Sequence, residues 1–555
     1  MTEELDRVFA YHQATKHHFG RFARGPVSLD WASQPEPFRR YRGARLIELE
    51  RIAPGDQPPY DLAFFVGHLA REPLNRRSVS QLFFDSLALS AWKRAGDVSW
   101  SLRVNPSSGN LHPTEGYLVC GPVEGLTAGP VVAHYAPREH GLEVRADFSM
   151  AIWQALTADL PAGAILVGLS SVHWREAWKY GERAFRYCQH DVGHAIAAVS
   201  LAAAGLGWHA MLLDGLGSDQ LAGLLGLTAP QVAEAEHPDC LLAVYPQGAT
   251  LSSLALPEVA LAEFGNLSWQ GTPNRLSSRH VAWPIIDEVA AATEKPPATG
   301  MYTEATQIHQ RQPASPPGSG LDLLEALNLT SLSLRQAIRQ RRSAVAMDGR
   351  GSISREAFYK IMLKTLAGPG QYPFNTLPWR PLIHLVLFVH RVEGLDPGIY
   401  LLVRDPGQKE ALRTAMRQDS AWERPPACPT ELDLYRLEAG DARTVARQLS
   451  CQQEIASNGC FSLGMLTQFD GPLEHFGPWF YPRLFWECGA IGQVLYLEAE
   501  AAGVRGTGIG CFFDDAVHQL LGLETSQYQS LYHFTVGHPV EDTRLTTLAA
   551  YSPSQ

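Results

Sequence analysis

An internal repeat constrains this chain more than any other feature. Residues 487–523 align without a gap on residues 191–227, at an offset of 296 positions (487 minus 191). Identical residues recur at matched positions, among them Gly193/Gly489, Leu201/Leu497 and Asp219/Asp515. A second match, of 123–126 with 392–395, lies upstream in both copies. Two matches in the same order indicate duplication, and a duplicated chain can imitate a two-fold dimer within one molecule.

The first copy of the repeat opens with a long apolar segment. Residues 191–206 are dominated by Ala, Val, Ile and Leu on nearly all sides, which predicts a buried helix. Gly193 and Gly205 lower helix propensity, so we expect close packing there. Upstream, the spacing of apolar residues over 83–92 predicts a helix, and short apolar runs at 117–120 and 163–169 predict buried strands.

Length and composition predict several domains. The 555 residues divide into an N-terminal arm at 1–60, a first domain at 61–268, an insertion or linker at 269–329 and a second domain at 330–555. The linker is marked by proline-rich stretches at 295–297 and 312–320, which disfavour regular structure.

Charge and cysteine usage narrow the class of protein. The net charge of −11 argues against a nucleic-acid partner. We expect no membrane segment, because no apolar run reaches about 18 residues, and the first residues lack signal-peptide character. The eight cysteines are scattered, so we expect reduced thiols in a cytoplasmic protein.

A polar loop at 103–113 carries the strongest functional pattern. Pro106 stiffens its entry and Gly109 can adopt a positive φ. Ser107, Ser108 and Asn110 offer hydroxyls and an amide. Alone, such a loop is also typical of an ordinary Asx or serine turn.

The sequence Pro-Ser-Ser-Gly-Asn at 106–110 resembles the flavin-contacting loop of the nitroreductase superfamily. The wider stretch 100–115 resembles the SagB/ThcOx-type FMN-dependent dehydrogenases, which oxidise azolines to azoles in ribosomal peptides. The resemblance covers roughly 60–260 and 330–545. It implies an α+β fold with tandem nitroreductase-like domains, in which an antiparallel-dominated sheet is flanked by helices in each half and the two long helices pack together. The two halves would form an intramolecular pseudodimer with FMN at their interface.

The resemblance also implies which residues hold FMN. From the first half these are Arg103, Pro106, Ser107, Ser108 and Asn110. From the second half they are a basic helix end (Arg339, Arg341, Arg342, Ser343), a glycine-rich loop near flavin N5 (Gly508, Ile509, Gly510) and a terminal Arg544 for the phosphate. For the basic helix end, a solvated helix terminus is the alternative interpretation.

The two halves have different sets of these motifs. The first half has Arg76-Arg77-Ser78 after a weak helix start, and the bulky stretch 210–214 in place of the glycine run. The second half has 377–382 where the first has its Pro-Ser-Ser-Gly-Asn loop. We therefore expect one complete site, and one FMN, per chain.

Lys179 and Tyr180 are the candidate catalytic residues, because a Lys-Tyr pair at this place resembles one implicated in azoline dehydrogenases. A lysine beside aromatic rings can act as a base, since desolvation disfavours its charge. Ordinary packing is the alternative. His190 and His194 have the i, i+4 spacing of a zinc pair, and His12, His17 and His18 cluster near the start, but neither set has an evident third ligand. We assign no metal.

The first hypothesis is therefore an FMN-dependent dehydrogenase of SagB/ThcOx type, which transfers hydride from an organic substrate to flavin N5. The alternatives are an NAD(P)H-dependent nitro- or quinone reductase, and a non-catalytic scaffold in a peptide-modifying complex. Expected partners are a small-molecule or peptide substrate, with no nucleic acid and no membrane. A further homodimer is left open.

Overall fold

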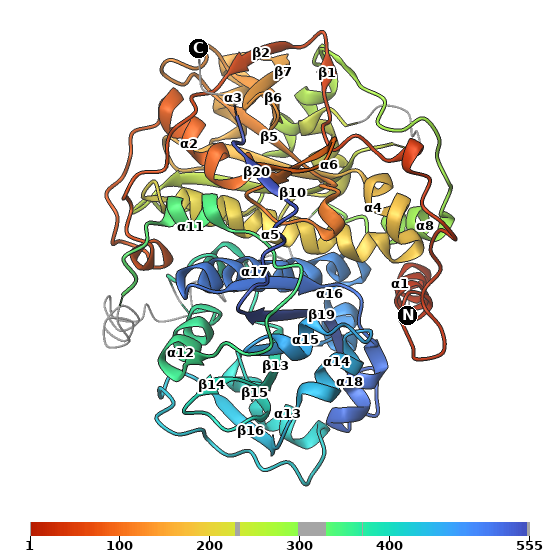
Figure 1. Cartoon of the computed structure of the whole chain (residues 1–555). Helices are drawn as coiled ribbons and strands as arrows, with labels where there is room; N and C mark the ends of the chain where they lie inside the picture. Colours follow the sequence, from red (N-terminus) through yellow and green to blue (C-terminus); the bar gives the residue numbers. More distant parts are fainter. Residues whose placement is uncertain (1, 228–233, 298–328, 369, 552–555) are drawn as a thin grey trace.

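The computed structural model describes residues 2–227, 234–297, 329–368 and 370–551. Each half contains a large antiparallel sheet (Figure 1), and six strands of the first sheet correspond in order to the six strands of the second. In the first half the order is β2 (Arg45–Glu48), β7 (Gly141–Asp147), β6 (Val131–Ala136), β5 (Thr114–Cys120), β8 (Ile165–Ser171), β10 (His237–Pro246) and β9 (Trp208–Leu212). In the second half it is β16 (Leu434–Ala439), β15 (Gly398–Leu402), β13 (Ile383–Val389), β17 (Phe461–Gln468), β19 (Tyr528–Gly537) and β18 (Arg505–Ile509). From β7 to β9 and from β16 to β18 the order corresponds strand for strand, which confirms the predicted duplication and the α+β class.

Two 21-residue helices meet at the centre of the molecule. These are α5 (Ala184–Ala204) and α17 (Tyr481–Ala501), which lie between the two sheets (Figure 1). They cross at two glycines related by the 296-residue offset. A Cβ atom on Gly193 would lie 2.3 Å from the Trp486 carbonyl oxygen, and one on Gly489 would lie 2.2 Å from the His190 carbonyl oxygen. Both glycines are thus required by backbone contact, as the sequence predicts.

Shorter helices complete each half. In the first half they are α3 (Met150–Leu156), α4 (His173–Tyr180), α6 (Ser218–Leu225) and α7 (Glu258–Ala262). In the second half they are α11 (Leu334–Gln340), α12 (Arg355–Lys364), α13 (Lys409–Ala415), α14 (Arg443–Leu449), α15 (Ile455–Asn458), α16 (Asp470–Phe476) and α18 (Asp514–Leu521).

The helix predicted at 83–92 was misplaced. The helix in this region is α2 (Arg76–Ser86), which starts at a capping box between Asn75 and Ser78. The chain then turns into β3 (Leu89–Ala95), which pairs with β4 (Val98–Arg103). The apolar residues of 83–92 therefore serve two elements, and their mixed spacing imitated one helix.

The two ends of the chain cross between the halves. Helix α1 (Glu3–Ala14) begins the predicted arm, and beyond it Lys16 forms an ion pair with Asp515 of the second half at 2.7 Å. In the opposite direction, β20 (Thr546–Leu548) adds a third strand to the β3–β4 hairpin. The N-terminal segment therefore contacts the second half, and the C-terminal strand β20 pairs with the first half.

The predicted linker is partly helical. Helix α8 (Pro284–Ala292) packs against α1, whereas the proline-rich stretch 312–320 lies outside the described residues. The domain limits 61–268 and 330–555 stay a prediction.

Candidate functional site

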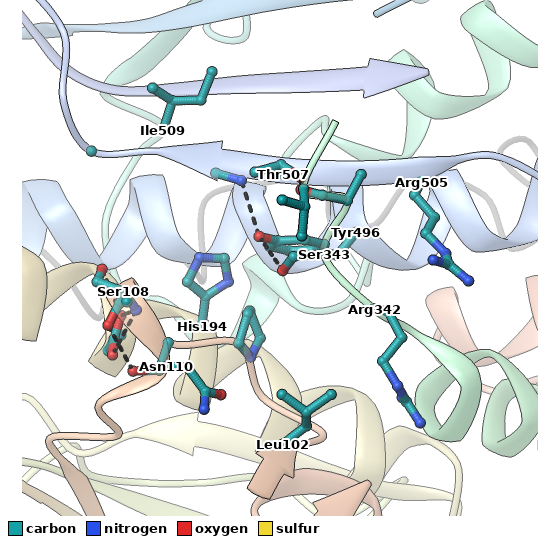
Figure 2. A pocket seen from close by; sticks show the side chains of 18 of the residues that line it. Leu102, Ser108, Asn110, His194, Arg342, Ser343, Tyr496, Arg505, Thr507 and Ile509 are labelled. Carbon is teal, nitrogen blue, oxygen red and sulfur yellow. Dashed lines mark hydrogen bonds between the residues drawn. The ribbon is translucent and has the colours of Figure 1, made fainter. Parts of the chain in front are cut away.

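A cavity of about 670 Å³ lies between the two halves and is lined by residues from both. Figure 2 shows Ser108 and Asn110 at one side of it, and Arg342 with Arg505 at the other. His194 and Tyr496, from the two central helices, lie between these groups. The predicted site residues that line this cavity are Arg103, Pro106, Ser107, Ser108, Asn110, Tyr180, Arg341, Arg342, Ser343, Gly508, Ile509 and Gly510.

The first-half loop is held in shape by its own polar groups. Asn110 has a φ of 61°; its side-chain amide donates to the Ser101 carbonyl and its oxygen pairs with His112. The Ser107 hydroxyl accepts from the His112 main-chain amide at 2.8 Å. The sequence predicted these side chains as ligand contacts, but in the structure they first fix the loop.

Asp191 on α5 accepts hydrogen bonds from the same loop. The Ser108 main-chain amide and hydroxyl both donate to its carboxylate, at 3.0 and 3.2 Å. Burial raises the pKa of Asp191 to about 7, against the lowering effect of the hydrogen bonds from Ser107 and Ser108. Sequence reasoning used Asp191 only as the start of the repeat and missed this contact.

Three of the predicted arginines contact other parts of the protein. Arg341 donates to the carbonyls of Val104 and Arg103, at 3.0 and 2.9 Å, and so ties the second half to the loop. Arg103 is buried and donates to the carbonyls of Thr114 and Pro37. Arg339 lies over the Phe84 ring, 4.0 Å from its centroid, and does not line the cavity. Its direct role in ligand binding, expected from the sequence, does not fit this geometry.

A cationic end of the cavity is formed by Lys93, Arg342 and Arg505. Burial, and the proximity of Arg341, lower the pKa of Arg342 to about 10. Burial, followed by repulsion from Arg342, also lowers the pKa of Lys93. Three cations crowded in this way have unfavourable mutual charge, which an anion would relieve. Arg505 also pairs with Glu541 at 2.7 Å.

Arg544 does not belong to this cationic end. Its guanidinium is 86% exposed and pairs with Asp542 at 2.8 Å, and the residue does not line the cavity. The chain carries β20 onward to the first half at this point, so Arg544 faces solvent. Arg505, on the edge strand β18, lines the cavity, whereas Arg544 does not. No motif marked Arg505 or Lys93, because they converge only through the contact between halves.

The second half supplies the opposite wall. The Ser343 hydroxyl donates to the Tyr496 hydroxyl at 3.0 Å, and the Gly508 main-chain amide donates to the same oxygen at 3.0 Å (Figure 2). The glycines of this wall make room for protein rings. A Cβ on Gly508 would lie 1.9 Å from the Tyr532 hydroxyl, and one on Gly510 would lie 2.3 Å from the Tyr187 ring.

Lys179 and Tyr180 end helix α4 beside the loop. A Cβ on Gly109 would lie 2.5 Å from the Tyr180 hydroxyl and 3.0 Å from the Lys179 ammonium nitrogen. Gly109 has a φ of 58°, so only glycine combines this conformation with this approach. Tyr180 lines the cavity, and the Lys179 nitrogen lies 5.2 Å from its ring centroid. The predicted pair is thus brought to the loop, although the two sites are about 70 residues apart in the chain.

The histidines singled out in the sequence make protein contacts. His190 contacts the Leu531 carbonyl, His194 contacts the Tyr532 hydroxyl, and His12 lies between Tyr481 and Gln529. Burial lowers the pKa of both His190 and His194. Among the described residues, no group of three or more His, Cys, Asp or Glu has the arrangement of a metal site.

The position related to this cavity by the duplication has a different structure. At the cavity, the Tyr187 hydroxyl donates to the Gly510 carbonyl at 3.1 Å. The residues 296 positions away are Arg483 and Asp214, which form a buried ion pair with an Nε–Oδ1 distance of 2.9 Å. Next to this pair is a smaller cavity of about 330 Å³. Four acidic residues are in its lining: Asp219, Glu236, Asp239 and Glu294.

Comparison with known proteins agrees with this architecture. The Nitroreductase family model matches residues 75–244 and 473–538. The crystal structure of a protein assigned as a nitroreductase, from Anabaena variabilis, shares 20% identity with a TM-score of 0.66, and covers 96% of this chain and 99% of that one. No curated protein gave a significant match.

Two further solved structures show weaker likeness. A protein assigned as a nitroreductase from Ralstonia eutropha shares 16% identity over 41% of this chain and 97% of its own, with a TM-score of 0.26. The Escherichia coli microcin synthetase McbBCD, solved with truncated pro-MccB17 bound, shares 18% identity over 44% of this chain and 94% of that chain, with a TM-score of 0.27.

The duplicated sheets and the family match agree with each other. The chain has two nitroreductase-like regions, one in each half. Members of this family are oxidoreductases. Among the described helices, none combines the length and apolar character needed to cross a bilayer.

Proposed function

We propose that this protein is an FMN-dependent dehydrogenase of SagB/ThcOx type, acting on an organic substrate such as a peptide azoline. The observation that carries the proposal is the composition of the cavity. A polar loop, a cationic end and Tyr180 converge there from separate parts of the chain, and Lys179 lies beside Gly109 of the loop without lining the cavity.

The residues of the cavity fit FMN. A phosphate carries about two negative charges, and Lys93, Arg342 and Arg505 are the cations that would hold it. Ser343 and the loop at 106–110 would contact the rest of the cofactor, with Ile509 and Gly510 beside its ring. Bound FMN would supply a two-electron acceptor for a hydride.

The protein's own task would then be to remove a proton. Conversion of an azoline to an azole forms a C=C bond between the two saturated ring carbons, and it removes a proton from one of them and a hydride from the other. The Lys179 amine lies beside Gly109, at the edge of the loop, and would take this proton. Tyr180, whose hydroxyl also approaches Gly109 and whose pKa is held well above its usual value by burial, would stay protonated and orient the substrate by donating a hydrogen bond.

The sequence around the loop and the Lys-Tyr pair support the dehydrogenase over a reductase that uses NAD(P)H. We further propose a cytoplasmic location, because all eight cysteines are free.

The test is anaerobic stopped-flow spectroscopy of the purified yellow protein. We expect one FMN per chain by released-flavin absorbance, slow bleaching with NADPH, and rapid bleaching with an azoline-containing peptide. Fast bleaching by NADPH with turnover of nitroaromatics would establish the reductase instead. Colourless, folded protein that takes up no added FMN would favour the third alternative, a non-catalytic scaffold.

A further inference from the structure

Two cysteines line the same cavity and have no part in the proposed reaction. Cys511 follows Gly510 beyond the end of β18, and Cys451 follows α14. Both are partly exposed. Of the other cysteines only Cys428 is partly exposed, and it does not line the cavity, while the remaining five are buried.

The fold holds these two thiols together. The segments that carry them lie side by side, because the Phe513 main-chain amide donates to the Leu449 carbonyl at 2.8 Å. Cys451 and Gln452 have φ angles of 52° and 62°, in the left-handed region that side-chain-bearing residues rarely adopt. Next to them, the Gln453 side-chain amide donates to the carbonyls of Ser450 and Cys511, at 2.9 and 3.0 Å. A rarely adopted backbone conformation and the Gln453 hydrogen bonds thus both position Cys451 near Cys511.

The surroundings of the pair favour a thiolate on Cys511. The hydrogen bond from Cys451 is the main cause that lowers the pKa of Cys511, and the His17 imidazole and the Arg183 guanidinium act in the same direction. The pKa of Cys451 is raised in turn. Asp514, which pairs with Arg183, is the carboxylate in this group. The thiolate is the nucleophilic form of cysteine, so the two sulfurs have different roles available to them.

We propose that Cys451 and Cys511 are a reversible dithiol–disulfide couple in the wall of the cavity, oxidised by a low-molecular-weight disulfide. The Cys511 thiolate attacks one sulfur of that disulfide, forms a mixed disulfide and releases one small thiolate, which takes up a proton. The Cys451 thiol then loses its proton and attacks the Cys511 sulfur, which expels the second small thiol. Two protein thiols and one small disulfide become one protein disulfide and two small thiols.

The disulfide would change the wall of the cavity. It would join the segment after α14 to the end of β18, directly beside Ile509 and Gly510. It would also remove the negative charge of a thiolate from that wall. The inference stands on the two thiols and their neighbours and does not depend on which cofactor or substrate the cavity takes.

The experiment treats the full-length protein, as purified, with glutathione disulfide, followed by peptide mapping under non-reducing conditions. We expect the native protein to lose two of its eight thiols, to gain a Cys451–Cys511 cross-link and to retain no glutathione. Cys451→Ser should retain one glutathione, on Cys511. The matched control is Cys428→Ser, which should behave as the native protein because Cys428 is also partly exposed but burial raises the pKa of its thiol to about 11.

A second measurement uses no variant. At pH 6.5, iodoacetamide should modify Cys511 in the native protein at least tenfold faster than Cys428. The proposal is wrong if the native protein keeps glutathione on Cys511 without a cross-link, if no cysteine of the pair reacts with glutathione disulfide, or if Cys428 is alkylated as fast as Cys511.

Discussion

The cavity and its counterpart across the duplication have different side chains at matched positions. Tyr187 and Gly510 leave room at the first site, whereas Arg483 and Asp214, at the matched positions, fill the second with an ion pair. The smaller cavity that remains beside the ion pair has acidic residues in its wall, which disfavour a phosphate. The chemistry of the two sites has diverged, although their backbones correspond.

The supporting contacts, in contrast, are similar at both sites. Asp191 on α5 accepts from the loop at Ser108, and the matched residue on α17, Glu487, accepts from the main-chain amides of Leu382 and Ile383. Glu487 also pairs with Arg404. A carboxylate on each central helix thus holds the corresponding loop of its own half. The residues that line the two cavities have diverged more than the carboxylates that position their walls.

The strongest test of the comparison removes the cationic end. Lys93, Arg342 and Arg505 changed together to Ala should weaken FMN binding roughly 10³–10⁶-fold, since each charge-assisted bond contributes about 1.5–3 kcal/mol and 1.4 kcal/mol is tenfold. Flavin fluorescence quenching measures the affinity. The control triple variant Arg76→Ala, Arg77→Ala, Arg544→Ala makes the same charge change outside the cavity and should stay yellow. A colourless but folded control would show that the wrong cations were chosen.

Lys179→Ala should leave FMN bound and lower turnover on the order of 10²–10⁴-fold, because a general base is lost. Its counterpart at the 296-residue offset is His475 in α16, and His475→Ala should keep native turnover. Steady-state rates with an azoline peptide measure both. Equal activity of the two variants would make Lys179 a packing residue.

The helix crossing should be the symmetric part of the molecule. Gly193→Ala and Gly489→Ala each place a methyl group against backbone of the opposite helix, so each should lower the free energy of unfolding by about 1–3 kcal/mol. Gly223→Ala, in α6 with no atom near its Cβ position, should instead stabilise the protein by about 0.5–1 kcal/mol. Denaturant unfolding compares the three. Unequal costs at Gly193 and Gly489 would show that the crossing too has diverged.

The last test concerns the pH dependence of stability at Asp191. Its pKa, raised by burial to about 7, means that the folded state holds a proton which the unfolded state loses near pH 4. Asp191 therefore makes stability fall as pH rises from about 4 to 7, by up to about 1.4 kcal/mol per pH unit. Asp191→Asn should flatten that slope relative to the native protein in denaturant titrations. An unchanged slope would mean that the Asp191 carboxyl is ionised throughout this range.

Local patterns predicted the fold better than the site. The apolar run at 191–206 predicted a buried helix and the repeat predicted a second copy of it, whereas the packing of the two helices together was implied by the family resemblance. The loop at 106–110 was predicted because its motif consists of consecutive residues. Arg505 and Lys93 could not be predicted, since one lies on an edge strand and the other on a hairpin, and only the contact between halves brings them together.

Arg339 and Arg544 illustrate the opposite error, and Arg341, which does line the cavity, also has partners within the protein. An arginine at the expected place in a motif was taken as a ligand contact, yet a guanidinium can equally cap carbonyls or pair with a neighbouring carboxylate. Arg341 satisfies two carbonyls of the loop and Arg544 its neighbour Asp542. Sequence cannot distinguish these partners, because the carbonyls that compete for each guanidinium come from distant residues.

The position of β20 has a consequence for how the protein is made. Lys93, at the cationic end, donates to Thr547 of this strand, and Leu545 just before it lines the cavity. Ribosomes deliver β3 451 residues before this strand begins (546 minus 95). The nascent chain can therefore form its first sheet early, but its cavity stays incomplete until β20 has been translated. A chain that stops before β20 would have an open site.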